Sequence, residues 1–176
     1  MMTAVVFAGN YARVTMPLAI AGQTSFTLAN ILCCLSGLIL GPLGALASGL
    51  GSALYDLFDP RFASECWITF INKGAMGLAT GLAAQQALAR DGLTYRRATV
   101  ASVLGCIAYY ILYFLKSFFY SGLLIQRLEP AVAAAVLPLK IPASLFNASV
   151  AILAAPPLAL AIREALKRSG LSRLTA

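Results

Sequence analysis

Between Arg13 and Asp56 the chain carries no charged residue over 42 consecutive positions. A helix that crosses the hydrocarbon of a bilayer needs about 20 largely apolar residues, so this stretch is too long for a single span. The turn-forming sequence Gly41-Pro42-Leu43-Gly44 divides it. The stretch therefore predicts two membrane helices, over about 26–40 and 45–58.

The remainder of the chain is similarly apolar. Hydrophobic residues make up 60% of the 176 positions and charged residues 11%, and the mean hydropathy is +0.84. A typical soluble domain has roughly 25% charged residues, and a soluble chain of this size cannot bury so much apolar surface. The same composition excludes intrinsic disorder. We predict an all-α integral membrane protein with one membrane domain over residues 1–176.

Four further apolar runs predict the remaining membrane helices. Their approximate bounds are 3–20, 67–84, 98–119 and 138–163, which makes six transmembrane helices in all. The first run is the weakest, because it contains Asn10, Arg13 and Pro17. The segment Ser121–Leu137 contains charged residues and a proline, so we expect an outer loop with a short interfacial helix there.

The distribution of basic residues predicts the orientation. One side of the predicted bundle carries seven of them, namely Arg90, Arg96, Arg97, Arg163, Lys167, Arg168 and Arg173. The other side carries only Arg61 and Arg127. Because cytoplasmic loops are enriched in Lys and Arg, both termini are expected in the cytoplasm, in agreement with an even number of spans. The first helix begins almost at Met1, and we expect the native chain to start a few residues earlier.

Five charged residues fall within or at the edges of the predicted spans, all in the outer half of the membrane: Arg13, Asp56, Lys73, Lys116 and Lys140. Charges inside hydrocarbon are costly and usually face a cavity or a partner. Several helices that contribute charges at one level indicate a polar pocket open to the outside. Its net charge of +3 favours an anionic or acceptor-rich ligand.

Each of these residues also has a structural interpretation. Lys116 and Lys140 lie close enough to the interface to snorkel, which is the favoured interpretation for both. Lys73 lies deeper, and a structural ion pair with Asp56 competes evenly with a ligand contact. Tyr109 and Tyr113 share a helix face and could stack on a planar ligand, although ordinary packing is the simpler interpretation.

Several functional motifs are absent from the sequence. The chain has no histidine, no P-loop, no nucleophile elbow and no metal-binding cluster. Asp56 is the only carboxylate inside a predicted span, so a relay of acids is also missing. We therefore predict no enzyme, no catalytic residue, no cofactor and no metal site. A passive binder that depends on an external motor fits these absences.

Four segments carry a family resemblance. They are Thr24–Asn30 (TSFTLAN), Leu38–Leu46 (LILGPLGAL), Gly49–Asp56 (GLGSALYD) and Phe70–Gly77 (FINKGAMG). In order and spacing they resemble the substrate-binding (S) components of energy-coupling factor (ECF) transporters, above all the group with a G-S-A-x-x-D and then an I-x-K-G pattern. The resemblance covers residues 1–84 well and the last helix weakly.

The resemblance implies a six-helix vitamin uptake protein of the bacterial cell membrane. Such a component captures a micronutrient at the outer face and topples while it is docked to a transmembrane coupling subunit and two ATPases. In the family, an A-x-x-x-A motif on the first helix contacts the coupling subunit, and Ala4 and Ala8 match that motif. Family ligands include flavin, pyridoxine-like, pantothenate, cobalamin and folate vitamins, and a basic pocket with tyrosines favours an aromatic or carboxylated one.

The predicted function is thus high-affinity vitamin capture and delivery to an ATP-driven module. The candidate pocket residues are Asn30, Asp56, Asn72, Lys73, Tyr109 and Asn147, with Ala4 and Ala8 for docking. Two alternatives stay open: a small structural or oligomerising membrane protein without a ligand, and a solitary facilitator without an ATPase partner.

Overall fold

The computed structural model describes residues 1–17, 23–90, 92–125, 127 and 129–169. Its elements are α1 (Met2–Gly9), β1 (Arg13–Pro17), β2 (Gln23–Thr27), α2 (Ala29–Leu40), α3 (Gly44–Phe58), α4 (Cys66–Arg90), α5 (Tyr95–Leu115) and α6 (Pro130–Arg168). A π-helix, Lys116–Ile125, continues α5. The prediction of a helical protein is confirmed, with the addition of one small two-stranded sheet.

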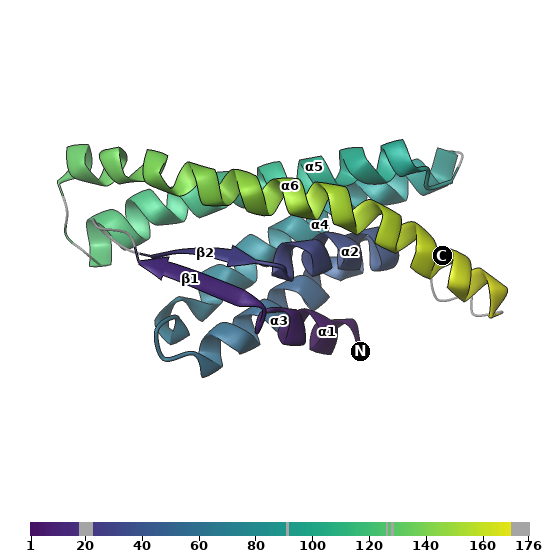
Figure 1. Cartoon of the computed structure of the whole chain (residues 1–176), viewed down its shortest axis with the longest axis horizontal. Coiled ribbons are helices and arrows are strands. Elements are labelled where there is room, and N and C mark those ends of the chain that lie inside the picture. Colours follow the sequence, from purple (N-terminus) through teal and green to yellow (C-terminus); the bar gives the residue numbers. More distant parts are fainter. Residues whose placement is uncertain (18–22, 91, 126, 128, 170–176) are drawn as a thin grey trace.

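Three helical stretches among the described residues are long and apolar enough to cross a membrane. They are Ala29–Phe58, Tyr95–Ile125 and Pro130–Arg168. In Figure 1, α5 and α6 lie side by side along the long axis of the molecule, and the strands lie between α6 and α3. The N-terminus, the end of α6 and the connection from α4 to α5 all lie towards the right of that view.

The N-terminal segment differs from the predicted helix over 3–20. The helix ends at Gly9, where the Asn10 side chain donates to the carbonyl of Val6 over 2.9 Å. The chain then forms β1, which pairs antiparallel with β2 from Arg13 opposite Thr27 to Pro17 opposite Gln23. Pro17 has no N–H to continue a helix, so an edge of a small sheet accommodates it. Residues 18–20 of the predicted helix lie outside the described residues.

The first of the three long stretches is a helical hairpin, not one straight helix. Gly41 has a φ of +62°, a conformation that glycine adopts without steric cost, and α2 turns back there into α3. The Ser36 hydroxyl consequently lies 2.6 Å from that of Ser48, on the facing helix. These buried hydroxyls also bond to backbone carbonyls of the hairpin, so they are satisfied without water.

Glycines allow α4 to pack closely against this hairpin. A Cβ atom built on Gly37 of α2 would lie 2.6 Å from the Gly77 carbonyl oxygen, and one on Gly81 would lie 2.2 Å from the Gly41 carbonyl oxygen. No side chain fits at either position, and such small residues are the usual means by which membrane helices approach one another. The contact holds α4 against α2 and α3 beneath the polar site.

The segment after α5 also differs from the prediction. In place of an outer loop over Ser121–Leu137, the π-helix reaches Ile125 and α6 begins at Pro130. A proline is favourable in the first turn of a helix, because the N–H that it lacks would have no partner there. The predicted last span over 138–163 therefore belongs to a helix of 39 residues that starts eight positions earlier.

Candidate functional site

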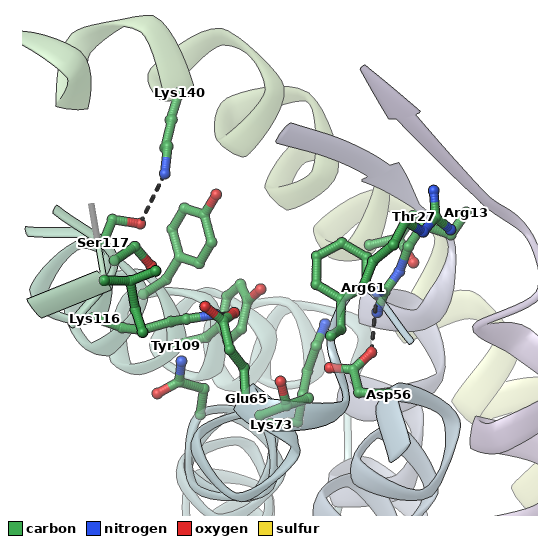
Figure 2. A pocket seen from close by; sticks show the side chains of 16 residues that line it. Arg13, Thr27, Asp56, Arg61, Glu65, Lys73, Tyr109, Lys116, Ser117 and Lys140 are labelled. Atoms are coloured by element: carbon green, nitrogen blue, oxygen red, sulfur yellow. Dashed lines mark hydrogen bonds and ion pairs between the residues drawn. The ribbon is translucent and has the colours of Figure 1, made fainter. Parts of the chain in front are cut away.

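A polar cavity of about 240 Å³ lies where β1, β2, α3, α4, α5, the π-helix and α6 meet. Figure 2 shows it with side chains from all of these elements directed towards its centre. Its lining residues are Arg13, Thr27, Asp56, Arg61, Phe62, Glu65, Thr69, Asn72, Lys73, Tyr109, Tyr113, Lys116, Ser117, Ser121, Ile125 and Lys140. The five cations and two carboxylates of this lining give it a formal net charge of +3.

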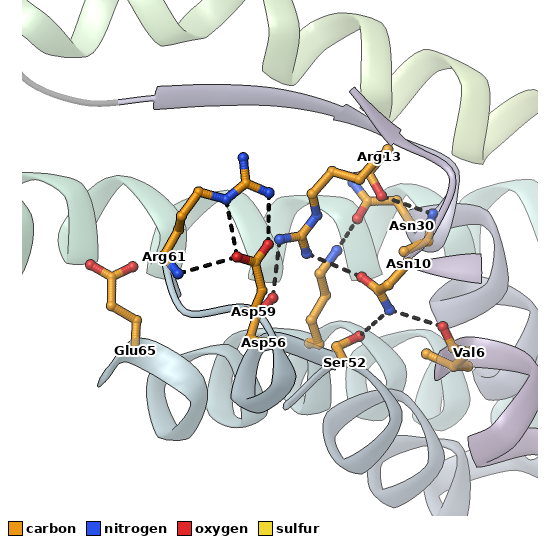
Figure 3. Close-up of polar contacts among 12 residues, drawn as sticks. Val6, Asn10, Arg13, Asn30, Ser52, Asp56, Asp59, Arg61 and Glu65 are labelled. Carbon is orange, nitrogen blue, oxygen red and sulfur yellow. Dashed lines mark hydrogen bonds and ion pairs between the residues drawn. The ribbon is translucent and has the colours of Figure 1, made fainter. Parts of the chain in front are cut away.

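Arg13 and Asp56 form an ion pair in the wall of the cavity. Nη1 of Arg13 lies 3.0 Å from Oδ1 of Asp56, and its Nη2 donates to the Asn10 side chain over 3.1 Å (Figure 3). The guanidinium also lies over the rings of Tyr55 and Phe62, 5.1 and 5.3 Å from their centroids. Of the two interpretations of Lys73, the ion pair with Asp56 is not the one formed, because β1 carries Arg13 to the end of α3 and Asp56 pairs with it.

Lys73 is 3% exposed and bonds to a neutral partner, the side-chain oxygen of Asn30. Its Nζ lies 4.5 Å from the centroid of the Tyr109 ring, a cation–π arrangement. The amide nitrogen of Asn30 in turn donates to the Tyr110 hydroxyl over 3.3 Å. Asn30 itself lies behind the cavity lining, so it positions Lys73 from outside the cavity.

Lys116 and Lys140 occupy the other end of the cavity. Lys116 forms an ion pair with Glu65, and Lys140 donates to the Ser117 hydroxyl over 3.3 Å (Figure 2). The expectation that Lys140 snorkels to the interface is wrong, since the residue is only 6% exposed. The reason is the early start of α6, which places Lys140 about 15 Å along the helix, facing the π-helix.

Tyr109 and Tyr113 form one wall between these two polar ends. Their rings stack with centroids 5.9 Å apart and an angle of 24° between the planes. Their spacing of four on α5 places both on one helix face, as the sequence indicates. Both rings line the cavity and add aromatic surface beside its cations.

Asp59 and Arg61 close the connection between α3 and α4. Nη2 of Arg61 lies 2.8 Å from Oδ2 of Asp59, and its Nε donates to Oδ1 over 3.0 Å. These hydrogen bonds from Arg61 hold the pKa of the Asp59 carboxyl below its ordinary value. The pair therefore stays ionised at neutral pH, and Arg61 remains held at the edge of the cavity.

The predicted site residues fall into three groups. Asp56, Asn72, Lys73 and Tyr109 line the cavity. Asn30 and Asn147 support it from behind: Oδ1 of Asn147 accepts a hydrogen bond of 3.0 Å from the backbone N–H of Thr27, which ties β2 to α6. Ala4 and Ala8 lie on the exposed face of α1, away from the lining residues.

Several lining residues carry no sequence pattern that marks them as part of the site, among them Phe62, Glu65, Ser117 and Ser121. Glu65 follows a turn, Ser117 lies at the end of the predicted span over 98–119, and Ser121 follows that span, so no periodic pattern marks them. Lys116 was the sequence signal for Glu65, because a lysine that points into a membrane protein needs a carboxylate partner. Among the described residues, no three His, Cys, Asp or Glu side chains are grouped so that they could hold a metal ion.

A family model described as the S component of the ECF-type riboflavin transporter matches residues 1–164, which include every lining residue of the cavity. No curated protein sequence matches the chain.

Proposed function

The chain belongs to the family of ECF-type riboflavin transporter S components, and on this premise we propose that it captures a flavin vitamin in the cavity between α3, α4, α5 and α6. S components are membrane subunits that bind a vitamin and work with an ECF module.

The observation that carries the proposal is the combination of an aromatic wall with polar groups in one cavity. Ligand sites are typically concave, with aromatic surface and a few placed polar groups. Tyr109 and Tyr113 line the cavity and provide aromatic surface against which a flat ring can pack. Asn72 and Lys73 line the same cavity and offer donors to ring carbonyls. The cavity is slightly smaller than the usual range of about 300–1,000 Å³, so side chains are expected to move apart when a three-ring ligand enters.

We also propose that the six helices α1 to α6 form the membrane domain, with both termini in the cytoplasm of a bacterial cell; α1, with eight residues, is too short to cross the hydrocarbon by itself. The concentration of basic residues around Arg96, Arg97 and the end of α6 supports this orientation. The cavity then opens towards the outer face, where a vitamin is scarce and high affinity is useful.

For docking, we propose that α1 presents Ala4 and Ala8 to the transmembrane coupling subunit. Both alanines are exposed, and Val5 beside them is 46% exposed. Small residues allow a partner helix to approach closely in lipid. A chain of this kind uses ATP only through its two ATPase partners.

One purification tests the assembly and one titration tests the ligand. The tagged protein is purified from its own host in mild detergent and its partners are identified by mass spectrometry. Recovery of a multispanning subunit with two ATPases supports the proposal. Recovery of the protein without partners, under conditions in which a known S component keeps its own, indicates a solitary carrier or a structural protein. Riboflavin is then added to the purified protein. A saturable rise in melting temperature is expected, because a ligand that binds only the native state must stabilise it.

A further inference from the structure

We infer that the cavity contains an oxyanion subsite formed by Lys140, Ser117 and Ser121, and that its ligand is a phosphorylated flavin. This inference rests on the proposed function, because it concerns a further property of the ligand in the same cavity. It adds a charged group to the flavin and assigns residues that recognise it.

Among the described residues, Lys140 is a buried cation without a carboxylate partner. It extends from α6 into the cavity, where its Nζ donates to the neutral hydroxyl of Ser117 (Figure 2). The residue is 6% exposed, so little water solvates its charge. No carboxylate of the described residues forms an ion pair with it. A buried charge without compensation is strongly unfavourable, and an anion on the ligand would compensate it.

Most other cations of the lining already have a carboxylate. Arg13 pairs with Asp56, Arg61 with Asp59, and Lys116 with Glu65. Glu65 is the lining carboxylate at the Lys140 end, and the charge of Lys116 balances it. In the part of the chain that the structure describes, Lys73 also has no carboxylate partner, but its hydrogen bond to Asn30 and its position over Tyr109 partly compensate its charge. Lys140 is thus the cation with the least compensation.

The π-helix supplies the hydroxyl groups of the subsite. Ser117 and Ser121 both line the cavity, and a π-helix is rare and frequently marks a functional site. A hydroxyl can turn its hydrogen towards an acceptor, so each serine can donate to an oxyanion. An ammonium group beside hydroxyl donors is a suitable set of groups for a phosphate.

The position of this subsite relative to the tyrosines defines the shape of the ligand. Lys73 lies over Tyr109, and Lys140 lies 5.9 Å from the centroid of the Tyr113 ring. The two lysines therefore mark opposite ends of the stacked pair. A flat ring against the tyrosines, with a chain that ends in a phosphate beyond Tyr113, fits this arrangement. Riboflavin is the uncharged counterpart of such a ligand.

The test compares riboflavin with flavin mononucleotide, its phosphorylated form, on the purified full-length protein. Dissociation constants are measured by the quenching of flavin fluorescence for the wild type, Lys140→Met, Lys140→Arg, Ser117→Ala and the exposed control Lys167→Met. We expect the wild type and the control to bind flavin mononucleotide at least about tenfold more tightly than riboflavin, as is typical for a charged hydrogen bond. Lys140→Met should remove this preference by weakening the binding of flavin mononucleotide far more than that of riboflavin, and Lys140→Arg should retain most of it.

Three results would overturn the inference. Equal binding of both flavins by the wild type excludes an oxyanion subsite, and equal weakening of both by Lys140→Met shows a structural role for the lysine. In both cases the protein still binds riboflavin, so the proposed function stands. If neither flavin binds, the proposed function fails, and the inference fails with it. Should Lys140→Met not fold, Ser117→Ala decides: it must lower the preference for flavin mononucleotide, and an unchanged preference counts against the subsite.

Discussion

Arg13 and Asp56 are 43 positions apart in the chain, yet Nη1 of Arg13 lies 3.0 Å from Oδ1 of Asp56. Both side chains are nearly buried, at 9% and 4% exposed. This ion pair fastens the start of the β-hairpin to the end of α3 (Figure 3). The hairpin is thereby held over the cavity that both residues line.

Removal of one member of this pair is expected to destabilise the protein. Asp56→Asn or Arg13→Met leaves a buried charge without its partner, which typically costs about 3–5 kcal/mol. The double variant removes both charges and should recover a large part of that loss. Unfolding of the detergent-purified variants by heat or denaturant measures the effect. Losses below about 1 kcal/mol in both single variants would mean that water solvates the pair as it does an exposed one.

Lys73→Ala is expected to lower ligand affinity and leave the yield of folded protein nearly unchanged. The lysine lines the cavity, while its bond to Asn30 links it to the helices behind. Loss of a charged hydrogen bond to the ligand corresponds to a roughly tenfold or greater weakening. Flavin titration and size-exclusion yield are compared with those of Lys167→Ala, an exposed lysine near the end of α6. A parallel loss of folding and binding would identify Lys73 as structural.

Ala4→Trp and Ala8→Trp should abolish vitamin uptake by cells but leave flavin binding intact. Both positions are exposed on α1 and lie away from the cavity. An indole there would prevent close approach of a partner helix. Ala135→Trp on α6 is the matched control, because that alanine is exposed on a different helix. Retained uptake in both α1 variants would remove the proposed docking role.

Gly81→Ala is expected to lower the melting temperature, because its Cβ would lie 2.2 Å from the Gly41 carbonyl oxygen. Backbone has to shift to relieve this contact, and such overpacking typically costs about 1–3 kcal/mol. Gly74→Ala is the control on the same helix, since its Cβ would meet nothing closer than the Ala45 carbonyl oxygen at 3.5 Å. Equal melting temperatures of the two variants would contradict the close packing of α4 against the α2–α3 hairpin.

Local features of the sequence determined the class of the protein and much of its helical content. Long apolar runs require helices in lipid, because each backbone polar group must then bond within its own segment. Gly41 and Pro42 mark the turn between α2 and α3 for equally local reasons. The charged residues that fall at one depth of the predicted membrane helices also predicted a polar cavity.

Only the tertiary structure decided which charge meets which. Asp56 could have paired with Lys73 by depth alone, but the β-hairpin carries Arg13 to it. The burial of Lys140 depends likewise on where α6 begins and on its packing against the π-helix. An electrostatic partner is set by distances between helices that are remote in sequence, and close contacts such as Gly37 with Gly77 set those distances. Residue order alone does not contain that geometry, so the class of the protein could be predicted and the pairing inside its cavity could not.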